Sequence, residues 1–130
     1  MRFRIPCWGI LCASLFVFST ASASTISVPA GGDLQAALNA AQPGDVIMLA
    51  PGATFVGNFV LPNKGLINDF ITIRSAAPDA ALPPAGVRVK PSDAAQLPTI
   101  RSANSGSALR TATAANHWKL QFLEFQANPG

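Results

Sequence analysis

The feature that most constrains this chain is a series of short apolar segments that Gly, Pro and Asn interrupt at close intervals. Short apolar or β-branched segments between such turn formers are typical of β-strands. The expected strands are Val46–Leu49, Thr54–Leu61, Phe70–Arg74, Thr99–Arg101, Ala108–Arg110 and Trp118–Phe125, and Val87–Lys90 is the one strand-like piece of the segment between residues 75 and 98. Gly57-Asn58 interrupts the second strand, and a change of apolar face near Phe122 predicts a bulge or bend in the last. Many short strands predict an all-β architecture, which could be a sandwich, a barrel or a solenoid.

One helix is expected, at about residues 34–41, directly before the first buried strand. Apolar residues recur at positions i, i+3, i+4 and i+7 from Leu34 to Ala41, which places them on one helical face. Asp33 occupies the N-cap position, and Pro43-Gly44 ends the helical pattern. A helix of about two turns is too short to be stable alone, so it must lie on an apolar surface.

Two observations favour the solenoid over the other all-β folds. A helix before the first strand can close the open end of a stack of coils against solvent and edge pairing. The chain also lacks the Asn-Gly and Asp-Gly turns that commonly join antiparallel neighbours.

Between residues 75 and 98 the series of strands stops, because prolines remove backbone donors and alanines fill much of the rest. This Pro/Ala-rich segment is expected to be either a functional loop or a poorly ordered one.

Residues 33–45, followed by the strand 46–49 and Pro51-Gly52, resemble the N-terminal cap and first coil of the pectate-lyase-like superfamily. Residues 70–75 resemble the next strand of these proteins, and residues 117–125 resemble a later coil. The resemblance implies a right-handed parallel β-helix with a short N-terminal capping helix. Because the sequence stops soon after its most aromatic strand, residues 24–130 are expected to be the N-terminal part of a domain truncated at its C-terminus.

The first 23 residues are typical of a secretory signal peptide. Arg2 and Arg4 precede an apolar run from Trp8 to Phe18, and Ala21 and Ala23 suit the small-residue cleavage motif. Cleavage is therefore expected between Ala23 and Ser24, and the protein is expected to be secreted or periplasmic. An uncleaved anchor is the alternative, but the apolar run is much shorter than the roughly 20 residues that span a bilayer. A lipoprotein modified at Cys12 is disfavoured, because Gly9 stands where a lipobox normally has Leu.

Cleavage would change both the cysteine content and the charge. Cys7 and Cys12 are the two cysteines of the chain, so the mature protein would have no disulfide. Arg2 and Arg4 are two of the nine Lys and Arg residues, which face six Asp and Glu, so the mature net charge is only +1. This charge does not indicate a nucleic-acid partner, and no stable membrane span is expected after cleavage.

The resemblance implies an extracellular polysaccharide as the partner, either pectin-like or another uronate or neutral glycan. Enzymes of the superfamily are polysaccharide lyases and hydrolases, whose grooves carry acidic residues for calcium or acid–base work, usually on later coils. No catalytic residue, no metal ligand and no cofactor is therefore assigned within this chain, although calcium is possible in the parent protein. The alternatives are a non-catalytic surface or carbohydrate-binding β-helix and an unrelated β-sandwich carbohydrate-binding module.

Arg88 and Lys90 are the candidate substrate-binding residues. They alternate with two valines, so an extended segment would place both charges on one face, either for an anionic sugar or simply for solvent. Asp45 is expected to form the turn before the first strand rather than to act as a catalytic acid. His117 is expected to cap or pack beside a tryptophan rather than to bind zinc or act as a base.

Overall fold

The computed structural model describes residues 22–128. The signal-peptide prediction falls largely on residues 1–21, which lie outside the described residues, as do Cys7 and Cys12. The strands are β1 (Thr25–Val28), β2 (Val46–Leu49), β3 (Thr54–Val56), β4 (Phe59–Leu61), β5 (Ile71–Ser75), β6 (Thr99–Arg101), β7 (Leu109–Thr111), β8 (Trp118–Gln121) and β9 (Glu124–Gln126). The helices are α1 (Leu34–Ala40) and two 3₁₀ helices, η1 (Asp79–Ala81) and η2 (Pro91–Gln96).

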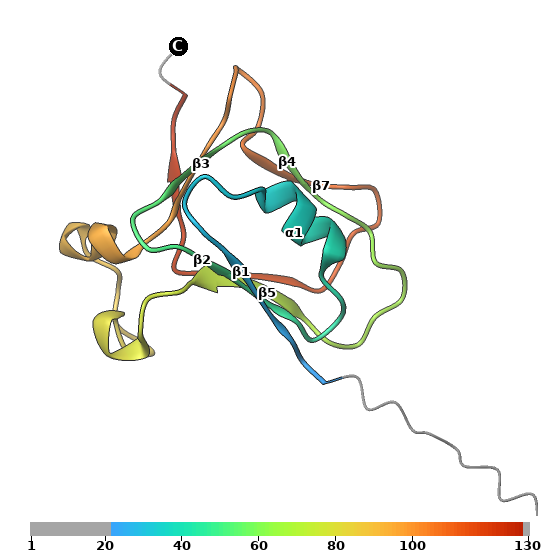
Figure 1. Ribbon diagram of the computed structural model, residues 1–130, viewed down its shortest axis with the longest axis horizontal. Coiled ribbons are helices and arrows are strands. Elements are labelled where there is room, and N and C mark those ends of the chain that lie inside the picture. The colour runs from blue at the N-terminus through green and yellow to red at the C-terminus, as the bar shows by residue number, and fades with distance from the viewer. Residues whose placement is uncertain (1–21, 129–130) are drawn as a thin grey trace, which may run out of the picture.

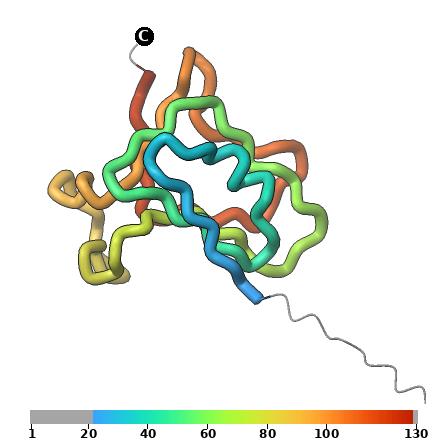
Figure 2. The backbone as a smooth tube through the Cα atoms, viewed as in Figure 1, coloured from blue at the N-terminus to red at the C-terminus, as the bar shows by residue number. Residues whose placement is uncertain are grey.

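Three parallel sheets surround one core, and the chain passes through them in turn (Figure 1). The sheets have the orders β1-β2-β5-β8, β3-β6-β9 and β4-β7, and every strand pairing among the described residues is parallel. Strands β2 to β4 form one coil, β5 to β7 lie on it as a second, and β8 and β9 begin a third. The smooth tube in Figure 2 shows these turns following one another around the same centre. The all-β prediction is confirmed.

Apolar side chains form columns through the stacked coils. In the first sheet the register aligns Ile26, Ile47, Ile73 and Leu120, and in the second it aligns Phe55, Ile100 and Phe125. The middle members of these columns, such as Ile47 and Ile73, are buried. Leu120 and Phe125, on the last described coil, remain 42% and 51% exposed. An apolar side chain in these columns is therefore buried by the coils stacked above and below it, and not by its own strand alone.

Helix α1 covers the first coil, as its apolar spacing predicts. The Asp33 side chain accepts a hydrogen bond from the backbone N–H of Ala36 at 3.0 Å, which is N-capping geometry. Leu34 and Leu38 are buried against the coil, and the helix ends at Ala40, close to the expected boundary. The helix lies beside β4 and β1 (Figure 1).

Two expected strands are each divided by a corner. Thr54–Leu61 is not one strand, because the chain turns at Gly57-Asn58 and β3 and β4 belong to different sheets. Trp118–Phe125 is likewise divided into β8 and β9, and the predicted bend is present at Phe122, whose φ of 53° lies in the left-handed region. An alternating apolar pattern indicates that residues are extended, but it does not indicate which sheet they join.

The strand-like piece Val87–Lys90 does not form a strand, and β1 is a strand that the sequence pattern did not predict. Residues 87–90 pair with no strand, since Pro84 and Pro91 flank them and the surrounding segment forms η1 and η2 instead. The loop from residue 76 to 98, here called the long loop, has its own small core of Ala77, Leu82 and Leu97, against which Phe122 packs. The missed strand, β1, pairs with β2 at the outer edge of the first sheet.

Candidate functional site

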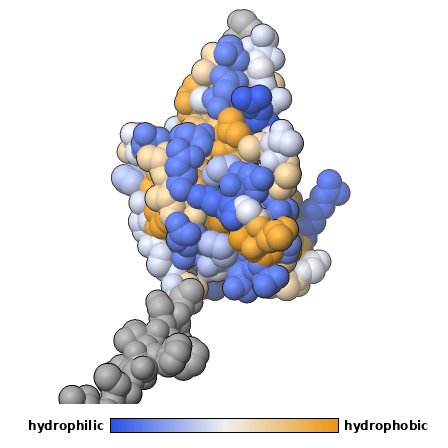
Figure 3. Space-filling model, turned by 90° about the vertical axis from the view of Figure 1, so that its right-hand side faces the viewer, coloured by the Kyte–Doolittle hydropathy of each residue, from blue (hydrophilic) through white to orange (hydrophobic). Residues whose placement is uncertain are grey.

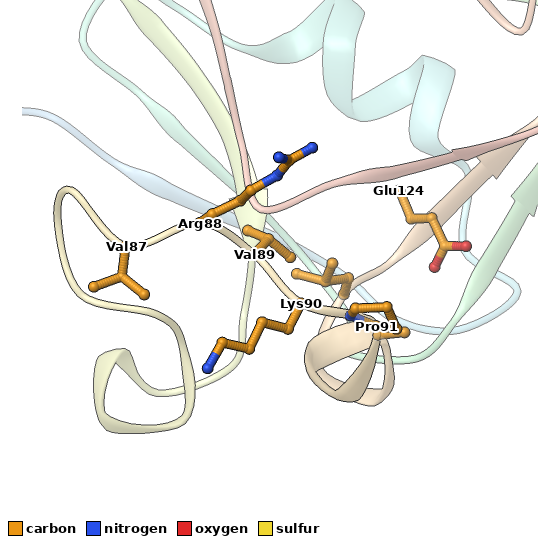
Figure 4. Close-up of a pocket in the computed structure, with 8 residues that line it drawn as sticks. Val87, Arg88, Val89, Lys90, Pro91 and Glu124 are labelled. Carbon is orange, nitrogen blue, oxygen red and sulfur yellow. The ribbon is translucent and has the colours of Figure 1, made fainter.

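A cleft of about 790 Å³ lies between the long loop and strand β9. Its lining residues are Val87, Arg88, Val89, Lys90, Pro91, Ala94, Leu97 and Glu124. Figure 4 shows the loop residues on one side and Glu124 on the other. The lining is therefore mainly apolar, with two cations and one carboxylate.

Arg88 and Lys90 both line the cleft and are both exposed. Their side chains do not share one face as an extended strand would require, because Figure 4 shows them diverging, with that of Lys90 directed away from Glu124. Within residues 22–128, neither side chain takes part in an ion pair or a side-chain hydrogen bond. Both cations can therefore meet a bound anion without first losing a protein partner.

Glu124 is the cleft residue that the sequence interpretation did not find. It is the first residue of β9, in register with Thr99 of β6, and its carboxylate accepts a hydrogen bond from the Gln126 amide at 3.1 Å. No local motif connects it with Arg88, from which it is far removed in sequence. Only the stacking of the third coil on the second brings it to the long loop.

Hydrogen bonds from the coil stack hold the long loop in place. The buried Ser75 hydroxyl donates to the carbonyl of Gln96 and accepts from the N–H of Ala77, which joins the two ends of the loop. The N–H of Gly52 donates to the carbonyl of Leu97 at 3.2 Å. A side chain at Gly52 would stand 3.2 Å from the carbonyl of Ala95, and its φ of 71° also favours glycine there. The loop is thus fastened to the first coil as well as the second.

Charged residues also fix the two short helices of the long loop. Arg74 forms an ion pair with Asp79 at the start of η1, and its guanidinium lies 5.8 Å from the centre of the Phe122 ring. The Asp93 carboxylate accepts a hydrogen bond from the N–H of Lys90 at 2.7 Å, while its own N–H donates to the Lys90 carbonyl at 2.9 Å. Arg74 therefore has a structural partner, and two hydrogen bonds to Asp93 hold the backbone of Lys90 where it lines the cleft.

Asp45 forms the turn before β2, as the sequence predicts. Its carboxylate is buried and accepts hydrogen bonds from the backbone N–H groups of Gln42 at 2.8 Å and Ser24 at 3.0 Å. Burial alone would raise the pKa of Asp45, but these hydrogen bonds and the charge of Lys64 outweigh it and lower that pKa. The group is therefore an ionised turn-former rather than a proton donor at neutral pH.

His117 lies at the corner before β8, where its φ is 57°. Its Nδ1 is 2.6 Å from the side-chain oxygen of Asn116, and its ring centre is 5.2 Å from that of Phe70. The ring thus packs beside Phe70 rather than beside the expected tryptophan. Within residues 22–128, no three His, Cys, Asp or Glu side chains gather in a way that could hold a metal ion.

Arg110, the middle residue of β7, lies at a second hollow. With Asn58, Asn104, Gly106 and Ser107 it lines a space of about 410 Å³ at the corner between two sheets.

On the side of the molecule opposite the long loop, Figure 3 shows hydrophilic residues surrounding small, separate apolar groups. In the described part of the chain no helix has the length and apolar character needed to cross a membrane.

Among solved structures, the chain is similar to the crystal structure of an alginate lyase from Paenibacillus sp. str. FPU-7. The two share 27% sequence identity with a TM-score of 0.54, over 81% of this chain and 32% of the lyase chain. This chain thus matches about one third of the lyase. No protein-family model and no curated protein sequence matches it.

Proposed function

We propose that this chain is the N-terminal part of a secreted or periplasmic right-handed parallel β-helix protein that binds or cleaves an anionic extracellular polysaccharide. The observation that carries the proposal is the similarity to an alginate lyase across most of the chain. The stack of parallel coils under an N-terminal helix supports the same conclusion, because polysaccharide-acting β-helix proteins share this arrangement. The resemblance of residues 33–52 to the cap of that superfamily agrees with it.

In this proposal the cleft between the long loop and β9 holds part of the sugar chain. Arg88 and Lys90 attract the carboxylates of uronate units, because neither cation is neutralised within the described residues. The Glu124 carboxylate accepts hydrogen bonds from sugar hydroxyls, which are donors. Val87 and Val89 supply apolar contact for the C–H faces of the rings. The three kinds of group together match an acidic polysaccharide better than a neutral one.

This segment is proposed to bind rather than to cleave. The lining of the cleft holds a single carboxylate, whereas hydrolysis of a glycosidic bond generally uses a pair of carboxyl groups, so the cleft does not have the lining of a glycoside hydrolase. Catalytic residues of the whole protein would then lie outside residues 22–128. A purely non-catalytic carbohydrate-binding protein is the second candidate, and the same single carboxylate favours it.

Electrophoresis of the protein through gels that contain alginate, polygalacturonate or a neutral glucan tests the binding proposal. We expect retardation by the two uronate polymers and little by the glucan. Replacing both cations, Arg88→Ala with Lys90→Ala, should weaken uronate binding about tenfold, since each charged contact is worth about 0.5–1 kcal/mol at an exposed site. Ultraviolet absorbance of an unsaturated product in the same mixtures would report lyase activity.

Arg110→Ala is the matched control for Arg88→Ala, because both remove one exposed guanidinium but Arg110 lies outside the cleft. Equal weakening by the two single variants would show non-specific attraction to positive charge and would contradict the assignment of the cleft. A protein that no uronate polymer retards would refute the proposed function itself.

A further inference from the structure

The buried carboxylate of Asp45 lies directly against the backbone nitrogen of Ser24. Asp45 is 5% exposed, and its Oδ1 accepts the N–H of Ser24 at 3.0 Å while Oδ2 accepts the N–H of Gln42. This contact joins residues that are 21 positions apart, so it is not part of the local turn. The contact therefore places the Asp45 carboxylate beside the backbone nitrogen of Ser24.

Ser24 is also where the first sheet begins. Its carbonyl accepts a hydrogen bond from the N–H of Val46 at 2.9 Å, and β1 starts at the next residue. Both backbone groups of Ser24 are therefore attached to the start of β2. The bond between Ala23 and Ser24 lies just before this attachment, and it is the bond where the small-residue motif predicts cleavage.

Hydrolysis of that bond adds one water, leaving a carboxylate on Ala23 and an amine on Ser24. Below a pH of about 8 the new amine binds a proton and becomes an ammonium group. We propose that Asp45 is the binding site for the N-terminal ammonium of the processed chain. Removal of the signal peptide then replaces a neutral hydrogen bond with a charge-assisted one, which is stronger. This inference rests on the processing site and is independent of the polysaccharide proposal.

The charged groups around this contact are compatible with an added cation. Lys64 interacts with Asp45 through its charge, but its ammonium donates a hydrogen bond to the carbonyl of Asn39 at 2.6 Å. Burial lowers the pKa of Lys64, and the charge of Asp45 partly offsets this effect. Asp69, whose Cβ lies near Gly44, adds a second negative charge on the segment between β4 and β5. The formal charges of Asp45 and Asp69 on this part of the chain thus outnumber that of Lys64.

Export of the full chain, followed by intact-mass measurement and thermal unfolding, tests the inference. The secreted protein is expected to begin at Ser24. An alanine inserted between Ala23 and Ser24 keeps the cleavage motif and every folded side chain but moves the ammonium one residue away from Asp45. We expect this insertion variant to melt about 5 °C below the native processed protein near pH 6.

The pH dependence separates an ion pair from a general effect of the insertion. An ammonium bound to Asp45 has a raised pKa, so its stabilisation is complete below the unfolded pKa of about 8 and is lost as the pH rises through the folded value. The difference between the two proteins should therefore vanish near pH 10, and it should be absent at every pH when both carry Asp45→Asn. A mature chain that begins elsewhere, or equal melting temperatures near pH 6, would overturn the inference.

Discussion

Gln35 is expected to be the residue of α1 that protects the open edge of strand β4. Its side-chain amide donates to the carbonyl of Val60 at 2.9 Å, and its side-chain oxygen accepts the N–H of the same residue at 2.9 Å. The N–H of Phe59 and the carbonyl of Leu61 are hydrogen-bonded on the side of β4 that faces β7. Gln35 therefore satisfies the N–H and the carbonyl of Val60, which face away from β7. The side chain thus takes the place that a neighbouring strand would occupy.

The substitution Gln35→Ala removes both of these hydrogen bonds at once. Each is worth about 1 kcal/mol net, so the free energy of unfolding should fall by about 2 kcal/mol. For a domain of this size each kcal/mol corresponds to a shift of about 4–8 °C, which predicts a melting temperature about 8–16 °C lower. Scanning calorimetry or circular dichroism of the exported protein measures this shift. Because an unpaired edge can template association, light scattering on the same samples should show more self-association.

Gln42→Ala is the matched control for this substitution. Gln42 is exposed, and its amide makes one long contact, of 3.5 Å, with the carbonyl of Ala40. Its replacement should change the free energy of unfolding by no more than about 0.5 kcal/mol. If the two variants melt at the same temperature, the edge-protecting role of Gln35 is refuted.

Three further predictions concern the coil stack. Leu38→Ala should lower the free energy of unfolding by about 2–5 kcal/mol in denaturant titrations, because this side chain of α1 is fully buried against the first coil; a loss below about 1 kcal/mol would contradict this packing. Asn58→Ala should speed amide exchange in residues 102–107, since the Asn58 amide donates to Ser102, Asn104 and Ser107; unchanged exchange would show that these bonds do not hold the segment. Asp45 has a lowered pKa, so its stabilisation is present above the unfolded value of about 3.8 and is lost as the pH falls through the folded one. Melting temperatures of native protein and Asp45→Asn should converge in acid, and parallel curves would argue against this linkage.

The elements that depend on neighbouring residues were predictable from the sequence. The helix 34–40, its Asp33 cap and the turn at Asp45 follow from helical periodicity and from side chains that bond to nearby backbone N–H groups. The extended character of residues 46–49 and 71–74 also follows from local apolar patterns. The small-residue cleavage motif is also a local signal, since it consists of contiguous residues, and cleavage after Ala23 stays a prediction.

The division of strands among sheets and the composition of the cleft depended on tertiary structure. Gly57-Asn58 could have been a bulge within one strand, and only pairing with β6 and β7 makes it a corner between two sheets. Residues 87–90 have a strand-like composition but find no partner, because the rest of the long loop packs as short helices over its own core. Glu124 lines the same cleft as Arg88 only because a coil returns the chain to the same side of the stack. Such contacts depend on how many residues complete each coil, and the insertion of a long loop changes that number without leaving a periodic signal.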